Sequence, residues 1–443
     1  MRNSARSCLV GVVGLLYAMH ALLADAAPAA APAVAAPQAL LRALSGSGLP
    51  LSSFGIFVQP VDGRREVAAI NADAPYVLAS TAKLVTALAA LDMLGPRWRW
   101  RTHAFVTGPI AHGRLNGNLM IVGGGDARLS TAELQGWMLR MRRQGLSEIG
   151  GDILLDHSAF ALTDADHRHT PEPDRPRHAW PDALMLDEGV MQVALKGTRS
   201  PRHTLLTTVM APRGPEHVGA AVARIWQQVG GTLAGQVREI DLTGGNPLSD
   251  RWPQLRAEDE PLLPWSTHLS EPLPQILRDM NKSSNNLTAR HLMLSMARGF
   301  PLRAASLPSA QASVHAWLRR QGLAEDDIEL DNGSGLSRTE RGKPRALVQL
   351  LLAAWHSHEA RSFVESLPVA GVDGTLQRRM QNGFATGRAF LKAGSLLDAR
   401  ALAGYVTGHS GTVYAVAALV NHPQAARAMP ALDAMIEWLA KNG

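Results

Sequence analysis

The chain has 443 residues, of which 46% are hydrophobic and 19% charged, and its formal net charge at pH 7 is +6. This length predicts two or three domains, and the composition is that of a soluble globular protein rather than a fibrous or disordered one. Basic and acidic residues are interspersed without a long basic block, which argues against nucleic-acid binding.

The first 26 residues are typical of a secretory signal peptide. Arg2 and Arg6 form a charged start, residues 9–23 form an apolar run, and Ala24-Asp25-Ala26 has the small residues of a cleavage site. A membrane anchor is the alternative, but the run is short for a membrane span and glycines interrupt it. We therefore predict a cleavable signal over residues 1–26 and export to the periplasm.

A flexible Ala/Pro-rich leader is expected over residues 27–37. No later segment is apolar enough to cross a bilayer, so we expect at most peripheral association with a membrane. The only cysteine, Cys8, lies in the signal, and the exported chain would therefore have neither disulfides nor thiol chemistry.

A β-hairpin followed by a helix is expected next. Residues 54–59 and 65–70 are strand-like and flank the turn residues from Pro60 to Gly63. An amphipathic helix is expected to begin at Ser80 and to end near residue 95, where Gly-Pro follows.

Strands and helices then alternate. Ser130 and Glu133 form a capping box, which predicts the start of a helix. Further strands are expected at residues 100–107, 117–122, 152–156, 388–397, 401–407 and 412–420. Further helices are expected at residues 218–229, 275–297 with an interruption around 282–286, 312–321, 346–356 and 429–441.

Strands near both ends of the chain, with helices between them, predict an α+β fold in which N- and C-terminal hairpins share an antiparallel sheet flanked by helices. We assign residues 38–95 and 263–443 to this catalytic domain. Residues 96–262 would then be one or more inserted domains of mixed α/β structure, because prolines and an acidic run mark a boundary near 255–265.

Lys83 is one of six lysines, and it is the only one with a serine, Ser80, three residues before it. Residues three apart lie on the same face of a helix, so the hydroxyl and the amine would be neighbours at a helix N-terminus. This geometry suits a serine nucleophile whose base is a lysine. The spacing by itself also fits a helix cap followed by a solvated lysine.

Two further motifs follow in a fixed order. Lys282-Ser283-Ser284-Asn285-Asn286 places a serine and an amide two residues apart, and Lys392-Ala393-Gly394-Ser395 lies on an expected strand. Four longer strings accompany them: Ile121-Val-Gly-Gly-Gly-Asp126, Gly151-Asp-Ile-Leu-Leu-Asp156-His-Ser-Ala-Phe160, Asp331-Asn-Gly-Ser-Gly-Leu-Ser-Arg338 and Leu367-Pro-Val-Ala-Gly-Val-Asp-Gly-Thr-Leu376.

With these strings the chain resembles the serine penicillin-recognising enzymes, and within them the D-alanyl-D-alanine carboxypeptidase/endopeptidase family of the DacB type. The resemblance implies a penicillin-binding, β-lactamase-like transpeptidase domain with extra domains inserted after the nucleophile helix. It implies action on peptidoglycan stem peptides, covalent inhibition by β-lactams, and no metal or other cofactor.

The resemblance also implies roles by position. Ser80 would attack the D-Ala–D-Ala carbonyl and Lys83 would take its proton. Ser283 would relay a proton to the leaving amine, and Asn285 would bind the substrate amide and hold Lys83. Lys392 would attract the terminal carboxylate of the substrate. The backbone N–H groups of Ser80 and Ser395 would form the oxyanion hole.

Two departures from the family pattern affect these roles. Ala393 replaces the usual threonine of Lys-Thr-Gly, before Gly394, and Ser395 is the candidate substitute because side chains alternate along a strand. Ser283-Ser284-Asn285 and Ser284-Asn285-Asn286 both fit Ser-x-Asn, and the preceding Lys282 favours the first.

Two other functions are alternatives. A serine β-lactamase of the same fold would hydrolyse its penicilloyl adduct quickly, and a non-catalytic scaffold would bind peptidoglycan without forming an adduct. Metal-type residues also gather in a polar, proline-rich loop, but without a regular ligand spacing, so no metal site is expected; they are His157, Asp164, Asp166, His167, His169 and His178.

Overall fold

The computed structural model describes residues 36–167, 180–195, 205–210, 215–240 and 263–443. The expected signal, most of the leader, and the boundary near 255–262 lie outside the described residues. Within the described ranges, no helix is both long enough and apolar enough to span a membrane.

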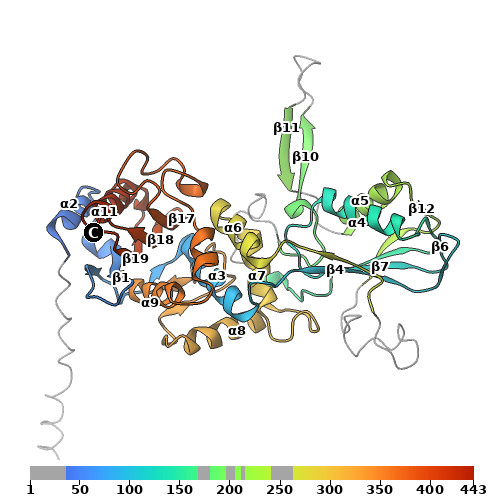
Figure 1. Cartoon of the computed structure of the whole chain (residues 1–443), viewed down its shortest axis with the longest axis horizontal. Coiled ribbons are helices and arrows are strands. Elements are labelled where there is room, and N and C mark those ends of the chain that lie inside the picture. The colour runs from blue at the N-terminus through green and yellow to red at the C-terminus, as the bar shows by residue number, and fades with distance from the viewer. Residues whose placement is uncertain (1–35, 168–179, 196–204, 211–214, 241–262) are drawn as a thin grey trace, which may run out of the picture. The chain divides into compact units, whose positions relative to one another are not determined.

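A five-stranded antiparallel sheet unites the two ends of the described chain, as predicted (Figure 1). Its order is β17-β18-β19-β1-β2, and β1 pairs with β19 from Phe54 opposite Val420 to Pro60 opposite Tyr414. The strands are β1 (Phe54–Pro60), β2 (Ala68–Ile70), β17 (Ala389–Ser395), β18 (Ala399–Thr407) and β19 (Val413–Asn421).

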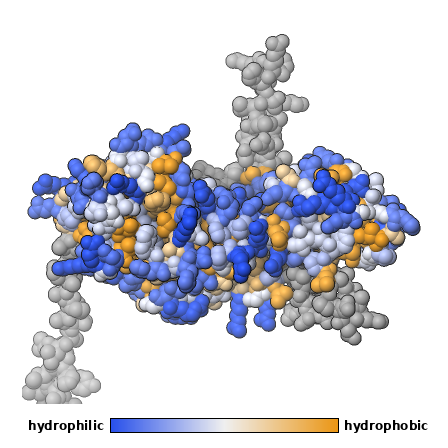
Figure 2. Space-filling model, in the orientation of Figure 1, coloured by the Kyte–Doolittle hydropathy of each residue, from blue (hydrophilic) through white to orange (hydrophobic). Residues whose placement is uncertain are grey.

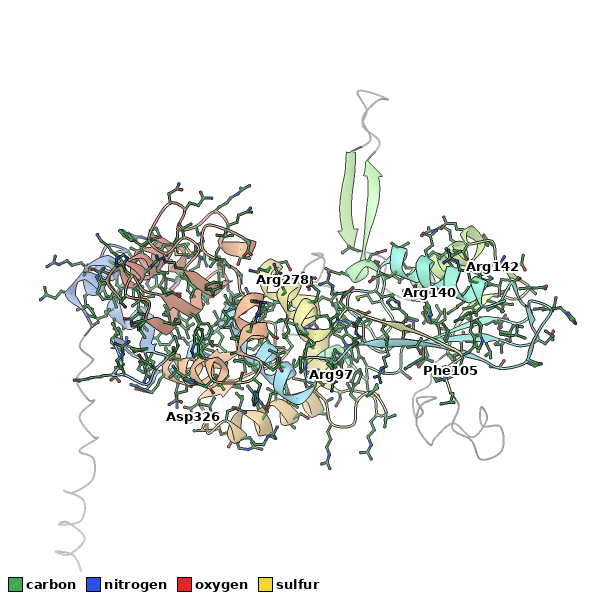
Figure 3. The ribbon with its side chains drawn as sticks, viewed as in Figure 1. Arg97, Phe105, Arg140, Arg142, Arg278 and Asp326 are labelled. Carbon is green, nitrogen blue, oxygen red and sulfur yellow. The ribbon has the colours of Figure 1, made fainter. Side chains whose placement is uncertain are left out.

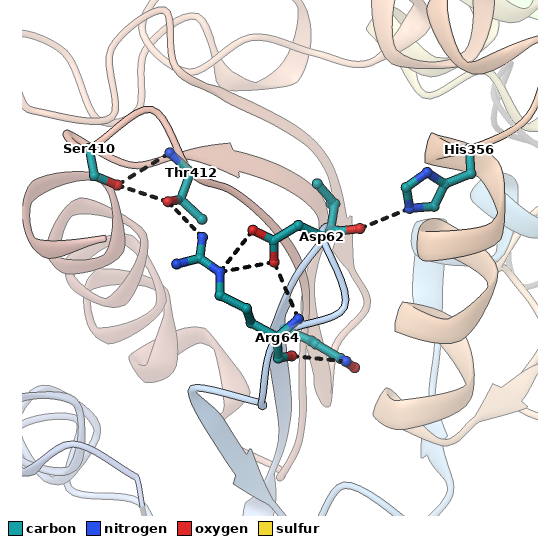
Figure 4. Close-up of polar contacts among 7 residues, drawn as sticks. Asp62, Arg64, His356, Ser410 and Thr412 are labelled. Carbon is teal, nitrogen blue, oxygen red and sulfur yellow. Dashed lines mark hydrogen bonds and ion pairs between the residues drawn. The ribbon is translucent and has the colours of Figure 1, made fainter.

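The turn between β1 and β2 lies beside the turn between β18 and β19 (Figure 4). The guanidinium of Arg64 lies 2.8 Å from the Asp62 carboxylate and 3.0 Å from the Thr412 hydroxyl. Both charged groups are exposed, so this pair contributes little stability, but it fits the predicted hairpin turn that ends at Gly63.

Helices cover both faces of this sheet. On one face, α2 (Gln38–Ser45) and α11 (Met429–Asn442) bury Leu and Met side chains against the strands. On the other face lies α9 (Pro344–Trp355), and the Tyr405 hydroxyl of β18 donates to the Leu351 carbonyl of that helix at 2.6 Å. Charged and polar residues cover most of the face seen in Figure 2, with hydrophobic residues in small groups.

Helix α3 (Ala82–Met93) is buried along almost its whole length, and further helices pack against it or against its neighbours. They are α6 (Leu273–Ser283), α7 (Asn286–Ser295), α8 (Leu307–Arg320) and α10 (Ala360–Ser366). A small sheet contains β15 (Ile328–Glu329), β16 (Arg341–Gly342) and β3 (Tyr76–Val77), and β3 leads into the turn before α3. The predicted interruption of the 275–297 helix is confirmed, because α6 and α7 meet at a corner formed by Ser284 and Asn285.

The chain between α3 and α6, which we call the insertion, forms its own sheets. The larger has the order β13-β9-β7-β4-β14 and is mixed, because β9 runs parallel to both β7 and β13. Its strands are β4 (Arg101–Val106), β7 (Leu119–Val122), β9 (Ile153–Asp156), β13 (Val237–Ile240) and β14 (Ser266–Leu269). The last of these pairs with β4 although it lies beyond the expected boundary at residue 262.

Two helices pack on this sheet through Trp137 and Trp226: α4 (Thr131–Arg143), which begins with the predicted capping box, and α5 (Pro215–Gln228). Figure 3 marks Arg140 and Arg142 on α4. The other strands of the insertion are β5 (Ile110–Ala111), β6 (Arg114–Leu115), β8 (Glu148–Ile149), β12 (Thr232–Leu233) and the hairpin of β10 (Val190–Leu195) with β11 (Leu205–Met210).

Candidate functional site

Ser80 lies in a single 3-10 turn, Ala79–Thr81, that joins β3 to α3. Ala79 has φ +47°, a left-handed conformation that alanine rarely adopts. Two glycines permit other segments to approach this turn. A Cβ on Gly335 would lie 1.9 Å from the Ala79 carbonyl oxygen, and one on Gly394 would lie 2.9 Å from the Ser80 nitrogen. The loop around residue 334 and strand β17 therefore close on the backbone of Ser80.

Lys83 lies one turn later, and its side chain is fully buried. Its Nζ is 3.1 Å from the Ser80 hydroxyl and 2.7 Å from Oδ1 of Asn286, and it also donates to the Ser334 carbonyl. Burial lowers the pKa of Lys83 to about 7, although the Glu340 carboxylate raises it. The amine can therefore be neutral near neutral pH and can accept a proton from Ser80.

Lys392 brings a second buried amine to the same site from β17. Its Nζ donates to the Ser284 hydroxyl at 2.9 Å and to the Ala393 carbonyl at 2.8 Å. Burial, and after it the charge of Lys83, lower the pKa of Lys392 well below its usual value. The charge of Lys83 thus disfavours a proton on Lys392.

The corner between α6 and α7 corrects the register expected for Ser-x-Asn. Ser284 and Asn286 lie against the two lysines. Ser283 is exposed and donates to the Asp279 carbonyl, while the amide oxygen of Asn285 caps α7 by accepting from the Thr288 N–H.

The physical reason is the left-handed conformation of Ser284, with φ 58° and ψ 40°, which turns its hydroxyl toward Lys392. The lysine that favoured the other register, Lys282, has a different role. Its ammonium forms an ion pair with Asp373 at 2.6 Å and donates to the Leu367 carbonyl, so it fastens α6 to a neighbouring loop.

The other predicted residues of β17 follow the alternation of a strand. Lys392 and Gly394 face the turn that carries Ser80, whereas Ala393 lies on the other face of this edge strand, only partly buried against the hydrophobic core of the five-stranded sheet. Ser395 is exposed and shares the face of Ala393 by alternation. The Leu391 N–H donates to the Pro368 carbonyl, away from β18. Because backbone N–H groups alternate in direction along a strand, the Ser395 N–H, four residues further on, is also directed to this outer edge.

Glu340 is a buried residue of the site that sequence reasoning missed. Its carboxylate accepts hydrogen bonds from the Gly333 and Gly335 N–H groups at 2.6 and 2.5 Å, and burial raises its pKa to about 7. These bonds hold the loop whose Ser334 carbonyl accepts from Lys83. The glycine-rich string 331–338 marked the loop, but no local pattern marked Glu340.

Of the metal-type residues named in the polar loop, the structure places His157 in an acidic environment. His157 lies 2.5 Å from Asp182 and 3.4 Å from Glu239, as an ion pair. No group of three or more His, Cys, Asp or Glu suited to a metal occurs within the described ranges. His169 and His178 lie outside them.

The arrangement as a whole provides a hydroxyl next to an amine that can be neutral, a second hydroxyl bonded to another amine, and an amide oxygen that orients the first amine. These are the parts of a serine nucleophile with a lysine base and a proton relay.

Comparison with known proteins identifies relatives over most of the chain. The model of the D-Ala-D-Ala carboxypeptidase 3 (S13) family matches residues 38–247 and 216–442. The D-alanyl-D-alanine carboxypeptidase DacB of Haemophilus influenzae is 26% identical over 415 residues, which cover 84% of this chain and 85% of that protein. The D-alanyl-D-alanine carboxypeptidase of Actinomadura sp. strain R39 is 28% identical over 393 residues, covering 75% and 71%.

Solved structures agree on the fold. Penicillin binding protein 4 (dacB) from Haemophilus influenzae superposes with a TM-score of 0.74 at 22% identity, over 91% of this chain and 99% of that one. A predatory endopeptidase from Bdellovibrio bacteriovorus, in complex with an immunity protein, gives a TM-score of 0.53 at 17% identity over 86% and 89%. The resemblance and the fold class expected from the sequence are confirmed.

Proposed function

The chain belongs to the D-Ala-D-Ala carboxypeptidase 3 (S13) family, and from this premise we propose that it is a periplasmic serine peptidase that releases the terminal D-Ala of peptidoglycan stem peptides through an acyl-enzyme on Ser80. The observation that carries the proposal is the 3.1 Å contact between the Ser80 hydroxyl and the buried amine of Lys83. The Lys392 amine, whose Nζ lies 2.9 Å from the Ser284 hydroxyl oxygen, completes the site together with that hydroxyl.

In the first half of the reaction, neutral Lys83 takes the proton of Ser80 as its oxygen attacks the penultimate D-Ala carbonyl. The tetrahedral oxyanion would be bound by the N–H groups of Ser80 and Ser395, at about 3 kcal/mol per donor. The C–N bond then breaks, and Ser284 protonates the leaving amine while it recovers a proton from the lysines.

In the second half, water attacks the ester carbonyl and gives a proton to Lys83. The C–O bond to Ser80 then breaks, Lys83 returns the proton to the Ser80 oxygen, and the shortened peptide leaves the free enzyme. Lys392 would provide positive potential for the carboxylate of the substrate. A β-lactam would acylate Ser80 in the same way, and because its leaving group stays attached the adduct would be hydrolysed slowly.

Incubation of the purified protein with pentapeptide muropeptides tests the proposal. We expect mass spectrometry to detect release of one D-Ala per peptide, absent with Ser80→Ala. Cleavage of a D-Ala cross-link uses the same acyl-enzyme with a longer leaving amine, so the same product analysis reports endopeptidase action. A scaffold would give no product and no penicillin adduct, and a β-lactamase would turn over penicillin quickly.

The two serines of the α6–α7 corner should differ in their effect on acylation. Ser284→Ala removes the hydroxyl bonded to Lys392 and should slow acylation by penicillin at least about tenfold, as expected for a general acid–base group. Ser283→Ala, which removes only a bond to the Asp279 carbonyl, is the matched control and should stay near wild type. If stopped-flow rates showed slower acylation for Ser283→Ala than for Ser284→Ala, Ser283 would be the proton relay, in the register that Lys282 favours.

The missing threonine hydroxyl at Ala393 should limit substrate binding. Ala393→Thr should raise kcat/KM on a D-Ala–D-Ala peptide about tenfold or more, since one hydrogen bond to a charged group contributes roughly 1.5–3 kcal/mol. Ala393→Val has the same shape without the hydroxyl and should give no gain. Equal kcat/KM for the threonine variant and wild type would mean that the hydroxyl is dispensable here.

The rate of acylation should depend on pH through the base. Burial lowers the pKa of Lys83 to about 7, so acylation should rise with pH as the amine loses its proton and level off above that value. Penicillin acylation rates measured from pH 5.5 to 9 should show this single rise. A rate that is flat across this range, or falls with pH, would argue against a neutral lysine as the base.

A further inference from the structure

We propose that Glu188 of the insertion is a positioning residue for the catalytic site. It would act by holding Asn285, the middle residue of the α6–α7 corner, and so keep Ser284 and Asn286 against the two lysines. The inference rests on the proposed function and extends it to a residue outside the three motifs.

The backbone that carries Glu188 is strongly curved and anchored. Asp187, Glu188 and Gly189 have φ values of 51°, 58° and 68°, so three successive residues are left-handed. The Asp187 carboxylate accepts from the Thr131 N–H at 2.9 Å and from the Thr131 hydroxyl, at the N-terminus of α4. Helix α4 therefore fixes the point from which the Glu188 side chain extends.

Glu188 contacts the corner through one hydrogen bond. The Asn285 side-chain N–H₂ donates to Oε2 of Glu188 at 2.9 Å, while its oxygen accepts from the Thr288 N–H at 2.9 Å. Both ends of the amide are thus bonded, one to α7 and one to the insertion. A side chain held at both ends has little freedom to rotate, which fixes the peptide units on either side of it.

The corner needs such support because Ser284 is left-handed, a conformation that a non-glycine residue keeps only when its surroundings impose it. Other contacts from the insertion reach the flanking helices: His291 of α7 bonds the Gly125 carbonyl at 2.8 Å, and Arg128 pairs with Asp279 of α6. Glu188 acts on the corner itself, where Ser284 and Asn286 meet the amines.

The contact requires a hydrogen-bond acceptor at position 188, and this separates its variants. Glu188→Ala should lower kcat at least about tenfold with a small change in KM, because a small misplacement of the relay slows chemistry more than binding. Glu188→Gln keeps an acceptor oxygen and should stay within about twofold of wild type. Glu148→Gln is the matched control, since Glu148 forms its ion pair with Arg114 inside the insertion.

A swap of donor and acceptor provides the second test. Asn285→Asp keeps the helix cap, for which aspartate is well suited, but sets a carboxylate against Glu188 and should lose activity. Combined with Glu188→Gln, whose amide can donate to the new carboxylate, it should regain most of the lost kcat. Thermal unfolding of each variant should remain near wild type, which separates positioning from loss of fold.

An active Glu188→Ala enzyme with wild-type kcat would overturn the inference and leave the proposed function intact, as would a double variant no better than Asn285→Asp alone. Equal losses for Glu188→Ala and Glu188→Gln would mean that charge matters rather than the acceptor, and would also overturn it. A wild-type protein without D-Ala release or penicillin adduct would refute the proposed function and this inference together.

Discussion

Replacing Lys83 by alanine should slow acylation of Ser80 by penicillin by a factor of about 10²–10⁴, the usual contribution of a general base. The nucleophile would remain, but the amine 3.1 Å from its hydroxyl would be gone. The loss would also leave Oδ1 of Asn286 and the Ser334 carbonyl without this donor. Stopped-flow fluorescence with a labelled penicillin measures the rate directly.

Lys343→Ala is the matched control for Lys83→Ala. Lys343 is also paired with protein groups, since its ammonium lies 2.7 Å from Asp326 and 2.9 Å from Asp327, but these partners belong to a separate surface cluster. Its removal should leave the acylation rate within about twofold of wild type, as for most surface substitutions. Retention of a near wild-type rate by Lys83→Ala would assign the base to another group.

Replacing Glu340 by alanine should lower the free energy of unfolding by about 3–5 kcal/mol. The carboxylate is fully buried and accepts two backbone N–H groups, and a hydrogen bond to a charged group contributes roughly 1.5–3 kcal/mol. Acylation should slow as well, because the same loop supplies the Ser334 carbonyl to Lys83. Urea denaturation followed by circular dichroism measures the first effect.

Glu329→Ala is the control for this loss of stability. Glu329 is exposed in the small sheet next to Glu340, so its substitution should change the unfolding free energy by less than about 0.5 kcal/mol. A similar small change for Glu340→Ala would show that the glycine-rich loop holds its conformation without the buried carboxylate.

The parts of the site that could be predicted from the sequence are those set by local geometry. Ser80 and Lys83 are one helical turn apart, and this spacing alone determines that their side chains are neighbours. Lys392 could be placed on a strand from its flanking pattern, and the shared sheet followed from strands near both chain ends. Resemblance to a family then connected these segments.

The parts that the sequence did not reveal depend on long-range contacts. Ser284 differs from Ser283 only through its left-handed backbone, which tertiary packing imposes and no neighbouring residue signals. Glu188 bonds an amide that lies 97 residues further along the chain, and Glu340 bonds two backbone N–H groups of the preceding loop. Isolated glutamates carry no periodic or motif signal, so neither contact could be anticipated. The strand at 266–269 was missed because its residues, Ser-Thr-His-Leu, are mostly polar and follow two prolines, so they lack the apolar pattern of the predicted strands.

We propose that Ser80 is the acylated nucleophile of a site that it shares with Lys83 and Lys392. Intact-mass analysis of penicillin-treated protein, followed by peptide mapping, tests it most directly. The account predicts one penicilloyl group per chain, located on the peptide that contains Ser80 and absent from a folded Ser80→Ala variant. An unmodified wild-type protein, or an adduct that persists in Ser80→Ala, would contradict it.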